Sequence, residues 1–213
     1  MFETLKQYPA WNIVATLTLY LLLYLVIISL IVFVLRPALR KYKPADLAVF
    51  NKISHLRTPA NDRIMLLLTF FGKHNFLIPA NLLLIFCFII FKSKQHYGLT
   101  VLLVSLSSVI LMFVFKWLFR RKRPADFLLF EAAGKSFPSG HAMMSVCFYG
   151  LMLHIIRHTG IAQWLFILIT VFVLLFILLI SFSRVYLRVH YLSDVIAGLI
   201  IGIGWLSICL QAV

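Results

Sequence analysis

The sequence is poor in charged residues, and acidic residues are much fewer than basic ones. Charged residues make up 12% of the 213 positions, with only six Asp and Glu against 20 Lys and Arg. Apolar residues make up 63%, and the mean hydropathy is +1.03, which excludes an ordinary soluble globular domain. We therefore predict an integral membrane protein. Its formal charge of +14 favours anionic headgroups or a phosphate substrate as partners over nucleic acid.

Cysteine is equally scarce. Cys87, Cys147 and Cys209 each lie alone in an apolar run, without the paired spacing of a disulfide framework or a metal site. The start of the chain has no short cationic region followed by a small-residue cleavage site, so no removable signal peptide is expected.

Long apolar segments are what the sequence does contain. Crossing a bilayer takes about 20 apolar residues in a helix. Six segments qualify, at 11–35, 64–91, 97–119, 139–156, 162–182 and 190–211. No alternating barrel pattern is present, so we predict an all-α polytopic protein with six transmembrane helices, forming a single membrane-embedded domain over 1–213. Gly72-Lys73-His74-Asn75 interrupts the second segment and predicts a helix break or a wet face.

Two connections are long, and six spans place both on one face of the membrane. The connection at 36–63 is basic with interspersed apolar residues, which predicts an interfacial amphipathic helix followed by a Thr-Pro-Ala-Asn turn. The connection at 120–138 is polar. A turn predicted at 184–189 lies on the same face, so the chemistry is expected at these helix ends.

The stretch 183–194 places a histidine and a carboxylate between apolar segments. On a helix His190 and Asp194 share a face, so the carboxylate can accept the second N–H of the imidazole and fix its tautomer. That arrangement prepares a nucleophile or a base. Arg184 lies about 240° around a straight helix from His190, so both reach one centre only if the helix breaks between them.

Two cations lie near the end of the third predicted span. Lys116 and Arg123 are almost two helical turns apart, and Pro124 would end the helix. Two cations on one face suit a phosphate, although a juxtamembrane basic cluster would read the same way.

A predicted helix start follows. Ser139 is a natural N-cap, and Gly140 and His141 leave backbone amides open to an anion. His141 could donate a proton to a leaving oxygen, and the alternative is a capped helix with an incidental histidine. All three elements together are the components of phosphoryl transfer without a metal.

These residues resemble the three-part pattern of the type 2 phosphatidic acid phosphatase (PAP2) family. The match consists of Lys116 with six residues to Arg123-Pro124, then Pro138-Ser139-Gly140-His141, then Ser183-Arg184 with five residues to His190 and three more to Asp194. The pattern occupies 116–194 and is complete. It is specific for the family and says little about the substrate.

The resemblance implies a role for each matched residue. His190 would attack phosphorus and form a phosphohistidine, Asp194 would orient it, and His141 would protonate the leaving group. The phosphoryl oxygens would be held by Lys116, Arg123, Ser139, Gly140 and Arg184. No metal or other cofactor is implied.

The resulting expectation is a lipid phosphatase, a hydrolase of the membrane. Its substrate could be undecaprenyl diphosphate, phosphatidylglycerophosphate, phosphatidic acid or lipid A phosphate. Transfer of the phosphoryl group to another acceptor, or lipid binding or transport without turnover, are the alternatives. The intact His190, Asp194 and His141 argue against a pure binder.

Orientation is the point on which two signals disagree. Of the 20 basic residues, 16 fall on the face of the long connections, and the positive-inside rule would make that face cytoplasmic. Bacterial members of the resembled family generally place the site on the outer side of the inner membrane. We expect the outer, periplasmic side, because a basic helix that collects substrate would distort the count.

Overall fold

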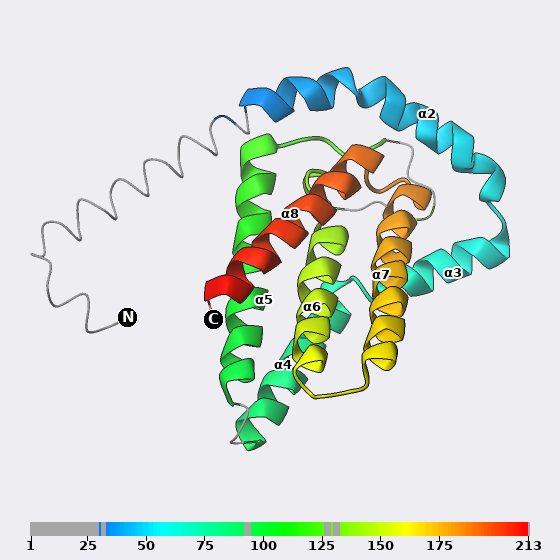
Figure 1. The fold of residues 1–213 in the computed structure, drawn as a ribbon. Helices are drawn as coiled ribbons and strands as arrows, with labels where there is room; N and C mark the ends of the chain where they lie inside the picture. The colour runs from blue at the N-terminus through cyan, green and yellow to red at the C-terminus, as the bar shows by residue number, and fades with distance from the viewer. Residues whose placement is uncertain (1–29, 31–32, 92–94, 126–128, 130–132, 213) are drawn as a thin grey trace, which may run out of the picture. The chain divides into compact units, whose positions relative to one another are not determined.

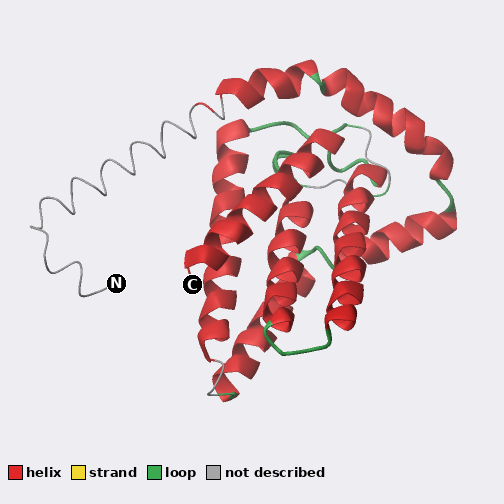
Figure 2. Ribbon diagram, in the orientation of Figure 1, coloured by secondary structure: helices red, strands yellow, loops and turns green. Residues whose placement is uncertain are grey.

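A computed structural model describes residues 30, 33–91, 95–125, 129 and 133–212, and within these the regular elements are helices, without strands (Figure 2). An all-α chain was predicted and is confirmed for this part. The predicted first span, 11–35, lies almost entirely outside the described residues. The chain divides into two compact units, 1–43 and 44–213. In the first, residues 33–41 are helical.

The second unit begins in a helical connection where an amphipathic helix was predicted. Helix α2 spans Lys43–Ile53 (Figure 1). The short 3₁₀ helix η2, Ser54–Leu56, follows it. Helix α3 then spans Pro59–Phe70. The predicted Thr-Pro-Ala-Asn turn is the start of α3, because the Thr58 hydroxyl caps the helix by accepting the Asn61 N–H at 3.1 Å and proline suits the first helical position.

The predicted break in the second span is present. Helix α3 ends at Phe70, and α4, His74–Ile90, begins after a turn at 71–73. The Tyr149 hydroxyl donates to the Phe71 carbonyl at 3.0 Å and ties this turn to a neighbouring helix. Gly72 fits there because a Cβ would lie 2.6 Å from Ile180 Cγ2 and 3.2 Å from His141 Cδ2.

Four further helices complete the described unit. They are α5 (Gln95–Phe119), α6 (Gly140–Arg157), α7 (Gln163–Tyr186) and α8 (Leu192–Ala212). Four stretches of the described chain are long and apolar enough to cross a membrane: Pro59–Ile90, His96–Phe119, Gln163–Tyr186 and Leu192–Gln211. The protein is therefore a multi-pass membrane protein. Helix α6 follows its predicted bounds, 139–156, but is not among these four.

Helix α8 packs closely on α6 because glycine lines the crossing. A Cβ at Gly198 would lie 2.7 Å from the Ser139 carbonyl oxygen, and one at Gly202 would lie 3.0 Å from the Met143 carbonyl oxygen. Small residues four apart let two membrane helices approach to backbone contact. Buried Leu206, further along α8, extends this contact to a core shared with α5 and α6.

This packing gathers four helix ends at one end of the bundle. Helices α5 and α7 end there, and α6 and α8 begin there (Figure 1). The long connection between α5 and α6 and the turn at 187–191 between α7 and α8 join them. All three sequence patterns singled out above lie at this end.

Candidate active site

Most of the predicted site residues meet in one cavity, whose lining includes neither Ser139 nor Asp194. Six of them line this cavity of about 640 Å³: Lys116, Arg123, Gly140, His141, Arg184 and His190. The cavity continues between α4, α5 and α6 along apolar side chains and also takes in His74, as the predicted wet break allows. The structure therefore brings together cations and histidines from four separate stretches of chain, and joins them to an apolar channel.

His190 lies in the turn before α8. Helix α7 continues through Arg184 to Tyr186, so the break falls at 187–191 rather than at the predicted 184–189. The Arg184 carbonyl accepts the N–H groups of Val189 and His190, each at 3.2 Å, and these bonds fold the turn back. The side chains of Arg184 and His190 therefore line the same cavity. The predicted break is real, but it begins after the arginine.

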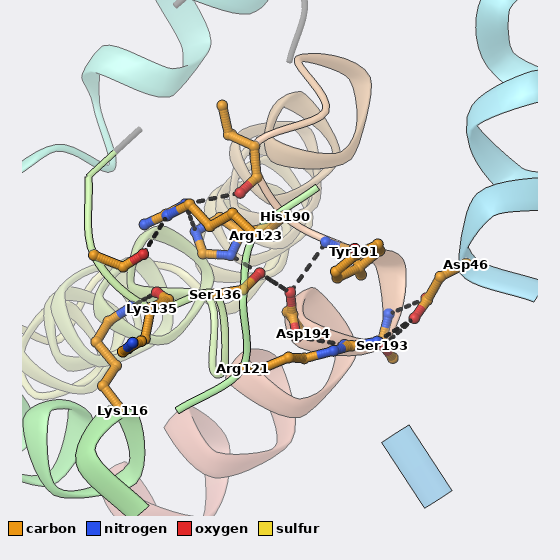
Figure 3. Close-up of polar contacts among 12 residues, drawn as sticks. Asp46, Lys116, Arg121, Arg123, Lys135, Ser136, His190, Tyr191, Ser193 and Asp194 are labelled. Atoms are coloured by element: carbon orange, nitrogen blue, oxygen red, sulfur yellow. Dashed lines mark hydrogen bonds and ion pairs between the residues drawn. The ribbon is translucent and has the colours of Figure 1, made fainter. Parts of the chain in front are cut away.

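The contacts of His190 fix its tautomer. Arg123 Nη1 lies 3.1 Å from His190 Nε2 and 2.7 Å from the Val189 carbonyl oxygen (Figure 3). A guanidinium can only donate, so Nε2 carries the lone pair and Nδ1 carries the proton. The ring is 1% exposed, and this burial lowers the pKa of His190 to about 3. His190 is therefore neutral at neutral pH.

Asp194 lies beside His190 but its hydrogen bonds go elsewhere. Its Oδ2 is 3.7 Å from His190 Nδ1, beyond a hydrogen bond, and accepts instead from the Tyr191 N–H at 3.0 Å and from the Ser136 hydroxyl. Oδ1 accepts from Arg121 Nη1 at 2.6 Å. The predicted hydrogen bond to the imidazole is thus not made here, because His190 precedes α8 instead of sharing a helical face with Asp194.

Main-chain carbonyls of the 133–135 segment accept from two of the predicted phosphate ligands. Lys116 Nζ donates to the Lys135 carbonyl at 2.8 Å, and Arg123 Nε lies 3.2 Å from the carbonyl oxygens of Ala133 and Gly134. The expected helix through Arg123 is not observed, since α5 ends at Phe119 and Arg120 has a φ of 48°. Lys116 and Arg123 nevertheless reach the same cavity.

Arg184 is the most enclosed of the cations. It is 3% exposed, and its Nη1 donates to the buried Thr69 hydroxyl of α3. Its Nε has no hydrogen-bond partner among the described residues. A buried guanidinium with an open donor can accept an anion at little additional cost in desolvation.

The start of α6 differs in one detail from the prediction. Ser139 occupies the N-cap position, but its hydroxyl makes no capping bond and, in the described part of the chain, has no partner. The Ser139 N–H instead donates to the Asp194 carbonyl at 3.0 Å, which ties α6 to α8. Gly140 leaves room for Met112, whose Sδ would be 2.6 Å from a Cβ. His141, next along, lines the cavity.

Four contacting residues were not predicted: Asp46, Thr69, Arg121 and Ser136. Arg121 was hidden within a run of basic residues, and Asp46 within a connection noted for its cations. Ser136 precedes the recognised helix start by three residues. Burial in the structure distinguishes three of them from ordinary surface polar residues, since Asp46, Thr69 and Ser136 are all less than 8% exposed.

Known proteins resemble this chain in sequence. The family model of the PAP2 superfamily matches residues 97–213. Phosphatidylglycerophosphatase B of Bacillus subtilis (strain 168) is 30% identical over 160 residues, covering 75% of this chain and 78% of the relative. Undecaprenyl-diphosphatase of Sulfolobus acidocaldarius is 29% identical over 168 residues, covering 76% and 75%.

Solved structures resemble its fold. The crystal structure of a transmembrane PAP2-type phosphatidylglycerolphosphate phosphatase from Bacillus subtilis superposes with a TM-score of 0.78 at 26% identity, covering 88% of this chain and 94% of the other. Aquifex aeolicus LpxE superposes with a TM-score of 0.61 at 25% identity, covering 78% and 94%.

Proposed function

Because the chain belongs to the PAP2 superfamily and is a membrane-bound lipid phosphatase of that type, we propose that it hydrolyses a lipid phosphate or diphosphate through a phosphohistidine on His190. One observation carries the proposal. The side chains of Lys116, Arg123, Arg184, His141 and His190 open into the cavity that continues as an apolar channel between helices. A phosphate headgroup and a hydrocarbon tail fit the two halves of that cavity.

The dimensions of the channel suit a lipid tail. Leu102 and Lys116 both line it and are fourteen residues apart on α5, which corresponds to about 21 Å along the helix. One leaflet contributes about half of a hydrocarbon core of roughly 30 Å, so the channel can take the full depth of a chain from one leaflet.

In the first step, His190 Nε2 attacks phosphorus. The bond from phosphorus to the leaving oxygen breaks, and His141 gives its proton to that oxygen. In the structure without substrate, Arg123 donates to Nε2. The phosphoryl oxygens therefore have to replace Nε2 as the acceptor of this donor before the lone pair of Nε2 is free. Lys116, Arg123, Arg184, the Ser139 hydroxyl and the Gly140 amide balance the charge on the phosphoryl oxygens.

In the second step, water attacks the phosphohistidine. His141 accepts the water proton, the bond between phosphorus and Nε2 breaks, and inorganic phosphate leaves. Asp194, within 3.7 Å of Nδ1, stabilises the positive imidazole in both steps. No step assigned here uses a metal.

The test is phosphate release by purified protein without added metal. The panel contains phosphatidylglycerophosphate and undecaprenyl diphosphate, for which the relatives are named, with phosphatidic acid and lipid A. We expect His190→Ala to abolish release, and His154→Ala, distant in the second half of α6, to retain it. A labelled enzyme intermediate that is stable to alkali and labile to acid is also expected. Release that persists in His190→Ala would refute the nucleophile, and lipid consumption without free phosphate would indicate a transferase.

We further propose six membrane spans over a single domain, 1–213, with the site on the outer face of the inner membrane. The antiparallel order of α5 to α8 supports a common face for the site. Lys135→Cys at the site and Arg157→Cys at the opposite end of α6 form a matched pair for labelling by an impermeant maleimide in intact cells. Labelling of Lys135→Cys alone is expected, and labelling of Arg157→Cys alone would reverse the orientation.

A further inference from the structure

Asp46 and Arg121, both outside the family pattern, are joined to Asp194 in a buried ionic cluster. Arg121 Nη1 donates to Asp194 Oδ1 at 2.6 Å, and Arg121 Nη2 donates to Asp46 Oδ2 at 2.8 Å (Figure 3). The side chains of Asp46, Arg121 and Asp194 are 5%, 12% and 0% exposed. One guanidinium therefore bridges two carboxylates, and one of these lies beside the proposed nucleophile.

Asp46 also holds the start of the helix that carries Asp194. Its Oδ1 accepts the Ser193 N–H at 2.9 Å, and its Oδ2 accepts the Ser193 hydroxyl at 2.6 Å. A carboxylate at this place satisfies an unpaired amide of the first turn and interacts favourably with the helix dipole of α8. Asp46 comes from α2, so a helix distant in sequence fixes the position of the active-site carboxylate.

The charges of the cluster explain why a second carboxylate is useful. Arg121 alone beside Asp194 would neutralise it and weaken its attraction for a positive imidazole. With Asp46 present, two carboxylates share one guanidinium, so the three side chains carry a net charge of −1. At low effective dielectric, this net negative charge acts on a positive imidazole that forms 3.7 Å away, on the side of the ring opposite to Arg123.

We propose that Asp46 is a positioning residue for phosphoryl transfer: through Arg121 and Ser193 it holds Asp194 in place and keeps its negative charge available to His190. This inference rests on the proposed function of His190 as nucleophile. Asp46 and Arg121 are not among the described residues that line the cavity, so neither is required to contact the lipid. Their influence is therefore expected on the chemical step and not on lipid binding.

The experiment compares Asp46→Asn with Asp62→Asn in full-length purified protein. Asparagine keeps the shape and one oxygen acceptor but removes the charge. Asp62 is the matched control because it is a half-buried carboxylate of α3 that accepts from the Tyr186 hydroxyl at 2.7 Å, outside the cluster. For Asp46→Asn we expect kcat to fall by about tenfold or more, with KM changed less than twofold. Asp46→Glu should recover part of the loss, and Asp62→Asn should leave kcat unchanged.

Inhibition separates this electrostatic role from a merely structural one. Vanadate mimics five-coordinate phosphorus bonded to the imidazole, whereas inorganic phosphate occupies only the cation pocket. Asp46→Asn should weaken vanadate inhibition by about the same factor as kcat and leave phosphate inhibition unchanged. Equal weakening of both inhibitors, or a rise in KM at constant kcat, would overturn the proposal.

A double variant tests the charge of the cluster separately from the contacts that Asp46 makes. Asp46→Asn with Arg121→Gln removes one charge of each sign and restores the net charge of −1. The double variant should be at least as active as Asp46→Asn, whereas losses that multiply would overturn the charge argument. His190→Ala is assayed in parallel. If it retains activity, the proposed nucleophile is wrong whatever Asp46 does, and if it is inactive while Asp46→Asn behaves as wild type, only the role of Asp46 is wrong.

Discussion

The glycine contact between α6 and α8 gives a sharp test of how helix packing sets the active-site geometry. In Gly198→Ala the new methyl group would lie 2.7 Å from the Ser139 carbonyl oxygen, a backbone atom that cannot rotate away. A carbon–oxygen contact is normally at least about 3.3 Å. Helix α8 would therefore move away from α6 by about 0.6 Å, or the start of α6 would yield by the same amount.

This displacement would move the proposed catalytic groups relative to one another. The Ser139 N–H donates to the Asp194 carbonyl at 3.0 Å, so the same movement separates the Asp194 end of the site from the His141 end. A misplacement of about 1 Å can cost about a hundredfold in rate, so about 0.6 Å is expected to cost roughly tenfold in kcat. Overpacking should also lower stability by about 1–3 kcal/mol.

Gly204→Ala is the matched control on the same helix, because, apart from its own helical turn, no described part of the chain lies within 4 Å of a Cβ there. It should raise stability by about 0.5–1 kcal/mol through helix propensity and leave kcat unchanged. The assays are thermal unfolding and phosphate release, in detergent micelles, from the lipid of the panel that the wild type hydrolyses fastest. If Gly198→Ala matched the wild type in both, or if Gly204→Ala lost as much activity, the packing argument would be refuted.

Three further outcomes are expected. Burial holds the pKa of His190 in the ligand-free protein at about 3, so its imidazole stays neutral as the pH falls and kcat/KM should hold from pH 7 to about pH 5; a loss of kcat/KM centred near pH 6.5 that persists in His141→Ala would contradict this. Thr69→Val removes the hydroxyl that accepts from Arg184 and should cost about 1.5–3 kcal/mol in thermal unfolding, whereas Thr170→Val, which loses only a bond to its own helix, should cost less. Ser105→Trp places a large ring in the channel and should raise KM for long-chain lipid phosphates while sparing a short-chain analogue, and an equal effect on both would show that the tail does not lie there.

The sequence predicted the helical class and six of the residues that line the cavity, since periodic apolar segments and the spacing of residues such as Lys116, His141 and His190 are local patterns. It predicted less well where helices end. Helix α5 ends at Phe119, where Arg120 takes a left-handed conformation. Arginine rarely adopts that conformation, so the sequence gives no sign of it. Helix α7 likewise continues past Arg184.

The contacts behind the cavity could not be predicted from local patterns. Asp46 and Asp194 are joined through Arg121 across long stretches of chain, and any of several basic neighbours could have been the bridging cation. The distance from His190 to Asp194 also depends on where α8 begins. Because α8 begins at Leu192, His190 lies in the preceding turn and does not share a helical face with Asp194. Such details are decided by tertiary packing.

The carbonyl groups of the 133–135 segment have a consequence for turnover. An enzyme that releases an anion in every cycle must avoid holding its product too tightly, and a pocket of bare buried cations would do so. Here the oxygens of Ala133, Gly134 and Lys135 already satisfy Lys116 and Arg123. In the proposed reaction these oxygens would compete with phosphate for the same donors, so the departure of the product would exchange one set of oxygens for another at Lys116 and Arg123. The segment is thereby expected to favour product exit.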